Sequence, residues 1–126
     1  MSLTDTLGIH IQTASATKVI LALPISDALK QPFGIVHGGI NAILAEEAAS
    51  RGALATVDGA HVPVGVDINV HHFHAAQTGT LVATATPLFI GHTMQTWQVD
   101  IKLGDTLTSS ATVTLAIKLK HKKEGD

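Results

Sequence analysis

The sequence predicts an α+β fold in which a curved antiparallel sheet encloses one long helix. Three observations lead to this prediction: the chain has one convincing helical segment, one strand-like segment precedes it, and four strand-like segments follow it with short interruptions. With 126 residues, 45% of them hydrophobic and 14% charged, the chain is long enough for one domain with a core and too short for two. We therefore expect a single domain over residues 1–126.

The first predicted element is a strand over residues 17–24. Its sequence, "TKVILALP", is rich in β-branched and aliphatic residues and ends at a proline. After it, Pro32, Gly34 and the pair Gly38-Gly39 interrupt any regular pattern. These residues indicate a loop that leads into the helix.

The helix is predicted over residues 40–57, an Ala- and Leu-rich run that follows the glycine pair. At 1.5 Å per residue it would be about 27 Å long. Its apolar residues spread around most of the helical wheel instead of forming one stripe, which is typical of a helix covered on most sides. We therefore expect the sheet to wrap around it.

Four strands are predicted after the helix, over residues 62–73, 80–89, 93–103 and 106–118. The stretches between them, "AAQTG", "IGH" and "LGD", are short enough to be hairpin turns, so each strand is expected to pair antiparallel with the next. The single tryptophan, Trp97, is expected in the core or at an interface. A curved sheet leaves free edges, and the mean hydropathy is +0.32, so we expect two copies to pair as a homodimer.

Composition excludes several classes of function. The chain has no cysteine, which rules out disulfides and thiol nucleophiles, and its formal net charge of -2 gives no general attraction to nucleic acid. No apolar run is long enough to span a membrane, and the N-terminus shows no export signal. The basic residues at 118–126 are interpreted as a flexible tail. We expect a cytoplasmic protein that binds neither nucleic acid nor membrane.

The predicted helix carries two adjacent glutamates with different surroundings. Glu47 lies four residues before Arg51, in the order that favours an ion pair along a helix. Glu46 has no basic residue three or four positions away, and it shares a face of small residues with Ser50, one turn later. From the helical wheel alone, Glu46 is either an exposed surface residue or a carboxylate that faces a ligand.

The loop before the helix favours a ligand. Gly38 and Gly39 place free backbone N–H groups at the positive end of the helix dipole, and glycine lets a ligand oxygen approach closely. Donors at a helix start can hold a developing oxyanion, while a carboxylate two turns later can act as base or nucleophile. The residues therefore predict a candidate acyl-transfer site.

The segment "QPFGIVHGGINAILAEEAAS", residues 31–50, resembles the signature of hotdog-fold acyl-CoA thioesterases of the PaaI-like group. Within that group it is similar to the branch of the 1,4-dihydroxy-2-naphthoyl-CoA thioesterase and the enterobactin proofreading thioesterase. The downstream text "GVDINVHHFHAAQTGTLVATATPLFIGHTMQTWQVDI" continues the resemblance without a large gap. The resemblance implies the hotdog fold, hydrolysis of an aromatic or medium-length acyl thioester, and no cofactor, since coenzyme A is part of the substrate.

The resemblance also implies roles for individual residues. Glu46 would be the catalytic carboxylate, as nucleophile or as general base on a water, and Ser50 would orient that water. Gly38 would polarise the thioester carbonyl through its backbone N–H, while Gln31 and His37 would contact or position the carbonyl. In this family the glutamate helix and the carbonyl-binding loop come from different subunits of a homodimer, and two dimers form a homotetramer.

The remaining candidate residues are assigned to substrate binding. Gly39 is grouped with the neighbouring glycine. His72 and His74 share one face of a strand and are expected to line the acyl pocket or the coenzyme A channel; they lack a third ligand, so no metal is expected. Gly91 and His92, in "IGHTMQ", stand where many relatives carry glycine and arginine, which is available to coenzyme A phosphates. The histidine leaves an acyl-carrier-protein thioester as an alternative substrate.

Two other functions remain open. The fold could serve as a non-catalytic acyl-CoA sensor, but binding needs no base, so Glu46 and its companions Ser50, Gln31 and His37 favour catalysis. A dehydratase or hydratase would pair a histidine with an acidic residue near the central helix, and His37 with Glu46 is a loose version of that pair. The downstream strands match the thioesterases better.

Overall fold

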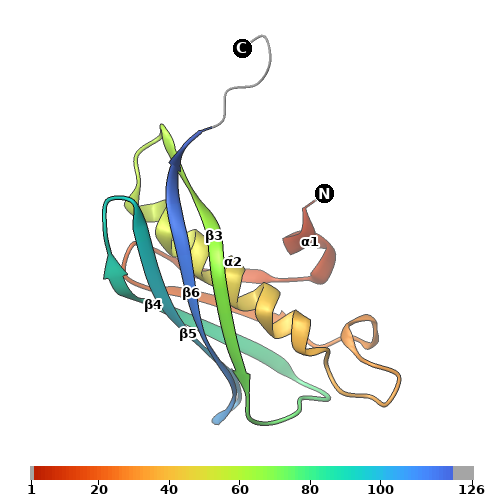
Figure 1. Cartoon of the computed structure of the whole chain (residues 1–126). Coiled ribbons are helices and arrows are strands. Elements are labelled where there is room, and N and C mark those ends of the chain that lie inside the picture. Colours follow the sequence, from red (N-terminus) through yellow and green to blue (C-terminus); the bar gives the residue numbers. More distant parts are fainter. Residues whose placement is uncertain (1, 121–126) are drawn as a thin grey trace.

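One antiparallel sheet of six strands curves around a long helix in the computed structural model, which describes residues 2–120 (Figure 1). The α+β class predicted from the sequence is confirmed. No helix within these residues has the length and apolarity to cross a membrane. Along the chain the elements are α1 (Leu3–Leu7), β1 (His10–Ala14), β2 (Val19–Pro24), the 3₁₀ helix η1 (Asp27–Leu29), α2 (Gly38–Thr56), β3 (His61–His72), β4 (Thr80–Ile90), β5 (Met94–Leu103) and β6 (Thr106–Leu119).

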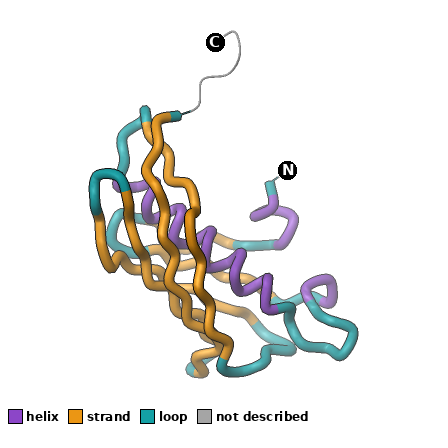
Figure 2. The backbone as a smooth tube through the Cα atoms, in the orientation of Figure 1, coloured by secondary structure: helices purple, strands orange, loops and turns teal. Residues whose placement is uncertain are grey.

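The strand order is β1-β2-β4-β5-β6-β3, so β1 and β3 form the two edges of the sheet. The predicted hairpins β4–β5 and β5–β6 are confirmed. The predicted hairpin over "AAQTG" is wrong, because β3 pairs with β6 and not with β4. The connection instead leads from the edge of the sheet towards its middle (Figure 2), and Phe73 and Ala76 in it hydrogen-bond to Thr108 and Val36.

Element boundaries differ from the prediction by a few residues. The helix begins at Gly38 and not at residue 40, so the glycine pair belongs to its first turn. Strand β6 continues to Leu119, so the first two residues of the predicted tail belong to the sheet; residues 121–126 lie outside the described residues. Three elements were not predicted, namely α1, β1 and the 3₁₀ helix η1. Helix α1 is a single short turn with a capping box formed by Ser2 and Asp5, and β1 is exposed along its whole length.

Helix α2 contacts all six strands but is buried along only one stripe. The opposite face carries Glu46 and Leu54, which are exposed. The prediction that the helix is covered on most sides is therefore wrong for a single chain. The buried stripe consists mainly of small residues and comprises Asn41, Leu44, Ala45, Ala48, Ala49, Gly52 and Ala53.

Trp97 of β5 fills the centre of the core, as predicted, and is fully buried. Its indole lies directly against α2 at Gly52, where a Cβ would stand 2.4 Å from the nearest ring carbon. The indole Nε1 donates to Oε1 of Gln95 at 2.9 Å, and Nε2 of Gln95 donates to Oγ1 of Thr56 at 2.6 Å. These two bonds tie the tryptophan to the last turn of the helix and fix its position.

Candidate active site

A cavity of about 300 Å³ lies between the start of α2, the loop before it, and the segment that follows β3. We call it the loop cavity; it is lined by residues 31, 35, 36, 38, 41 and 72–76. Four of the residues predicted from the sequence meet here: Gln31, Gly38, His72 and His74. They come from two stretches that are distant in the sequence, residues 31–41 and 72–76, so the fold itself assembles this part of the predicted site.

Gly38 is the first residue of α2, and its backbone faces the imidazole of His72. A Cβ at this position would stand 3.0 Å from Nε2 of His72, so glycine is what lets the ring lie against the helix start. Nδ1 of the same ring is 3.0 Å from Oγ of the buried Ser109, which fixes the orientation of the ring. The first N–H groups of a helix have no intrahelical acceptor, so this end of α2 presents backbone donors to an incoming oxygen.

The other two residues predicted at the helix start lie outside the lining of the loop cavity. His37 is the N-cap residue, is exposed, and makes no capping hydrogen bond with its side chain. Gly39 is also exposed, and a Cβ there would meet no atom within 4 Å. Both remain close to the cavity along the chain; the backbone N–H of His37 donates to the Leu29 carbonyl at 3.0 Å, and Gly39 belongs to the first turn of α2.

Glu46 stands apart from the loop cavity. It lies eight residues beyond Gly38, which is about 12 Å along the helix axis. Its carboxylate is exposed and lies against β3 at Gly65, where a Cβ would be 2.7 Å from Oε2. Within one chain, therefore, the predicted catalytic carboxylate and the predicted carbonyl donor do not meet.

The neighbours of Glu46 on α2 have distinct environments. The predicted Glu47–Arg51 ion pair is confirmed, with 2.9 Å between Oε1 and Nε, and the Thr4 hydroxyl donates to the same Oε1 at 2.8 Å. Ser50 is half-buried and lines a second, more open cavity of about 310 Å³ beside β3. Ser50 therefore lies one helical turn after Glu46 and outside the lining of the loop cavity.

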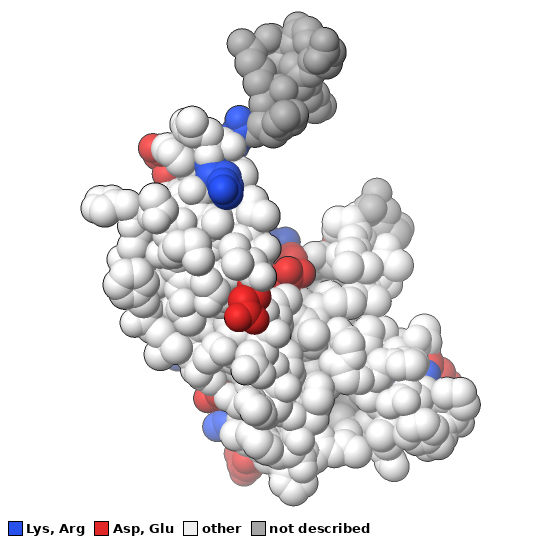
Figure 3. Space-filling model, viewed as in Figure 1, with Lys and Arg blue, Asp and Glu red and all other residues white. Residues whose placement is uncertain are grey.

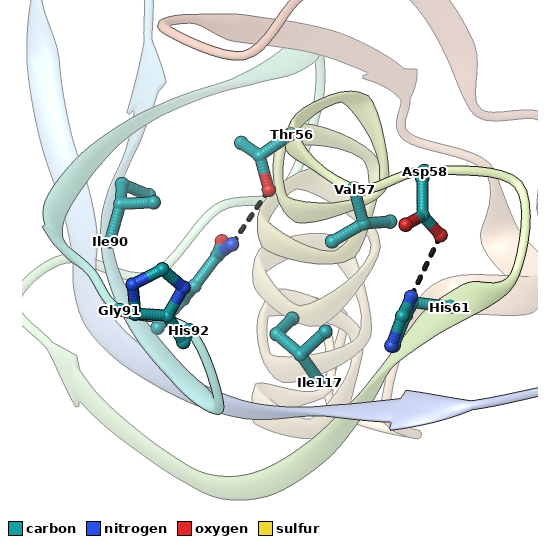
Figure 4. A pocket seen from close by; sticks show the side chains of 9 residues that line it. Thr56, Val57, Asp58, His61, Ile90, Gly91, His92 and Ile117 are labelled. Atoms are coloured by element: carbon teal, nitrogen blue, oxygen red, sulfur yellow. Dashed lines mark hydrogen bonds and ion pairs between the residues drawn. The ribbon is translucent and has the colours of Figure 1, made fainter.

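Gly91 and His92 lie near the opposite end of α2, which is about 28 Å long. They line a cavity of about 530 Å³ whose far wall carries Asp58 and His61 (Figure 4). The hydrogen bond from His61, 2.7 Å long, and a second from the Ala60 N–H lower the pKa of Asp58 below its ordinary value. The carboxylate therefore stays ionised at neutral pH, and its small stabilising effect is lost only as the pH falls through this lowered pKa.

Two buried polar residues of the site were missed in the sequence. Ser109 orients His72, and Asn41 lines the loop cavity while it is only 7% exposed. Oδ1 of Asn41 has no hydrogen-bond partner among residues 2–120, which costs about 1–3 kcal/mol relative to a paired group. A signal for Asn41 existed: it is the one polar residue on the otherwise apolar stripe of the helix.

The sequence model of the Thioesterase superfamily matches residues 33–110, which is more than half of the chain. The chain belongs to this superfamily. The matched region contains Gly38, Glu46, Asn41, His72 and Ser109, and so the carboxylate on α2 and the lining of the loop cavity apart from Gln31. The fold supports the same conclusion, and the predicted resemblance to hotdog thioesterases is confirmed.

Similar proteins cover almost the whole thioesterase chain. The 1,4-dihydroxy-2-naphthoyl-CoA hydrolase of Listeria monocytogenes is 35% identical over 123 residues, which are 97% of this chain and 100% of that protein. A mutant of a hypothetical protein from Staphylococcus aureus superposes with a TM-score of 0.92 at 32% identity, covering 94% of this chain and 100% of the other. A thioesterase from Haemophilus influenzae gives 0.89 at 31% identity, with coverages of 94% and 83%.

Proposed function

We propose that this protein hydrolyses acyl-CoA thioesters that carry an aromatic or medium-length acyl group. The observation that carries the proposal is the loop cavity, where the N-terminus of α2 at Gly38 and the side chains of Gln31 and His72 converge. Such donors stabilise the negative charge that develops on a thioester carbonyl oxygen during attack. The family to which the chain belongs supports the same reaction class. We expect it to act in the cytoplasm, where acyl-CoA is available.

We propose further that a second copy of the chain completes the site, because one chain keeps Glu46 and Gly38 about 12 Å apart along α2. Strand β3, which runs beside Glu46, is a free edge of the sheet. Val64 and Val66 on it are 47% and 59% exposed, and few charges cover this face of the molecule (Figure 3). Pairing of two β3 edges in a homodimer would bury these residues and bring the helix of one copy towards the cavity of the other. Two such dimers would form the expected homotetramer.

The proposed reaction needs only a carboxylate, backbone donors and water. Glu46 takes a proton from a water, whose oxygen attacks the thioester carbon while the Gly38 N–H holds the developing oxyanion. The tetrahedral intermediate then expels the thiolate, which takes up the proton, and the products are a carboxylic acid and free coenzyme A. Direct attack by Glu46 would give the same products through an anhydride that water then hydrolyses.

The test is a panel of thioesters assayed by release of free thiol. It contains benzoyl-, dihydroxynaphthoyl-, phenylacetyl- and straight-chain acyl-CoA, together with one acyl-carrier-protein thioester. We expect turnover of at least one aromatic or medium-length substrate, with kcat/KM of at least about 10⁴ M⁻¹ s⁻¹. Saturable binding without release of thiol would indicate a sensor. An enoyl-CoA is assayed separately by the loss of its double-bond absorbance, and its hydration without hydrolysis would indicate a hydratase; either result contradicts the proposal.

The contact between Glu46 and Gly65 supplies a prediction that separates activity from stability. An alanine at position 65 would place its Cβ within 2.7 Å of Oε2, so the carboxylate must move, and a flexible side chain end can do so at little cost to the fold. A displacement of about 1 Å at a catalytic group lowers the rate by about 10- to 100-fold. Gly65→Ala should therefore lose activity to this extent while its melting temperature and its elution volume in gel filtration stay unchanged. Unchanged kcat would show that Glu46 needs no fixed position.

A further inference from the structure

Asn41 in the loop cavity has a side chain that the fold itself does not explain. It lies one turn into α2 on the stripe that faces the sheet, and 93% of its surface is covered, since only 7% is exposed. Its Oδ1 is sealed from solvent and has no partner among the described residues. Its Nδ2 makes no hydrogen bond with the described residues either. Unlike Oδ1, Nδ2 is not sealed from solvent, so the N–H end of the amide is the end open to the cavity.

An apolar residue would suit this position better if packing alone decided it. The next residues along the same stripe are Leu44, Ala45 and Ala48, all fully buried without any polar atom. A buried amide with neither end paired is rare in folded proteins, and such exceptions are typical of positions that serve a ligand. The partner of Asn41 is therefore to be sought in the molecule that fills the cavity.

The cavity has an inner end and an open end, and Asn41 belongs to the inner one. Val36 and Ala76, each 6% exposed, form that inner wall, where the Val36 N–H donates to the Ala76 carbonyl. His72 and His74 are exposed at the open end. The charged coenzyme A part of the substrate must extend towards solvent, and about 300 Å³ suffices for one acyl group and not for coenzyme A as well. Asn41 therefore faces the acyl group.

We propose that Asn41 determines substrate specificity, with its Nδ2 donating a hydrogen bond to an oxygen substituent on the acyl group close to the thioester carbonyl. Gly38 and Asn41 are three residues apart, about 4.5 Å along the axis, and helical side chains lean back towards the N-terminus. An oxygen held by Asn41 therefore lies within about three bonds of the carbonyl carbon that faces Gly38. An ortho-hydroxyl on an aromatic acyl group satisfies this geometry. This inference rests on the proposed thioesterase function of the loop cavity.

The test compares two substrates of equal size, 2-hydroxybenzoyl-CoA and 2-methylbenzoyl-CoA. The wild type, Asn41→Leu and Asn41→Ala are assayed with both; neither leucine nor alanine has a side-chain donor or acceptor. Intrinsic reactivity differs between the substrates but is the same for every variant, so a change in the ratio of kcat/KM reports the side chain. We expect the hydroxyl preference of the wild type to fall by about tenfold in both variants. An unchanged ratio, or an equal loss on both substrates, would overturn the proposal.

The melting temperature of Asn41→Leu distinguishes a role in substrate binding from a purely structural role of Asn41, because the two roles predict changes of opposite sign. Asn41→Leu removes an unpaired buried amide, so its melting temperature should rise by about 4 °C. The matched control is Gln95→Leu, which removes a buried amide whose two ends are paired with Thr56 and Trp97. This control should melt at lower temperature and keep the substrate ratio of the wild type. A lower melting temperature for Asn41→Leu would show that the amide serves the fold.

A binding measurement separates this inference from the proposed function. The probes are 2-hydroxyphenacyl-CoA and 2-methylphenacyl-CoA, thioethers that keep the carbonyl but cannot be hydrolysed, with affinity measured by calorimetry. If the wild type prefers the hydroxyl probe and both Asn41 variants do not, while no thioester is hydrolysed, the inference stands and the thioesterase proposal fails. If thioesters are hydrolysed but the variants keep the preference of the wild type, the inference fails and the thioesterase proposal stands. A wild type without any preference overturns the inference.

Discussion

Replacing Glu46 with glutamine should lower kcat for the preferred thioester by about three orders of magnitude. Glutamine keeps the shape of the side chain but can neither accept a proton from water nor attack the carbonyl. Glu46 is exposed and makes no ion pair or hydrogen bond within residues 2–120, so the fold should be unaffected. Steady-state release of free thiol measures the loss, and circular dichroism with thermal unfolding checks the fold.

Glu47→Gln is the matched control, because it makes the same chemical change at the next residue. Its carboxylate is already engaged by Arg51 and Thr4, so this variant should lose less than about 1 kcal/mol of stability and keep kcat within about threefold. A Glu46→Gln protein with wild-type activity would contradict the proposed mechanism. Equal losses in the two variants would indicate a general effect of charge on α2 and not a specific role of Glu46.

Replacing Gly52 with alanine should destabilise the folded state by about 2 kcal/mol. The new Cβ would stand 2.4 Å and 2.5 Å from two ring carbons of Trp97, and the indole is fully buried and hydrogen-bonded, so it has no free space to enter. Overpacking of this kind costs about 1–3 kcal/mol and sometimes more. Alanine offsets up to about 1 kcal/mol through its higher helix propensity. Denaturation by urea measures the net change as a lower midpoint.

Gly39→Ala is the control for Gly52→Ala in stability. Position 39 lies in the same helix, and a Cβ there meets no atom within 4 Å. The helix propensity of alanine should therefore raise stability slightly or leave it unchanged. If Gly52→Ala unfolds at the same urea concentration as Gly39→Ala, the close approach of α2 to Trp97 is not what requires glycine.

The fold was predictable where the signal is local. The hairpins β4–β5 and β5–β6 follow from short turns around Gly91 and Gly104, and the helix follows from its Ala- and Leu-rich composition. The partner of β3 was not predictable in the same way, because seven residues that separate two strands do not say whether the second strand turns back or crosses over. Strand β1 gave no signal, since all five of its residues are exposed and no apolar alternation marks it.

The candidate site was likewise predictable only in part. The spacing between the glycine pair and Glu46 could be read from the sequence, and the fold brings Gln31, His72 and His74 to Gly38 as expected of residues that bind one ligand. Asn41 gave a weaker signal, as one polar residue on an apolar stripe of the helix, and its burial and its missing partner are properties of the packed structure. The separation of Glu46 from Gly38, in contrast, follows from the eight helical residues between them, and the resemblance already implied that the two groups meet across subunits.

The small residues along the buried stripe of α2 make the helix behave as a rigid rod laid on the sheet. Four alanines and Gly52 bring the helix backbone close to the strands, and apart from Asn41 and Leu44 the stripe has no longer side chain that could absorb a change in volume. We therefore expect a larger residue near Trp97 to tilt helix α2 as a rigid body. Such a tilt would displace the N-terminal end of the helix, where Gly38 lies. Substitutions in this core are consequently limited by the geometry of the proposed site as well as by stability, even at positions outside the lining of the loop cavity.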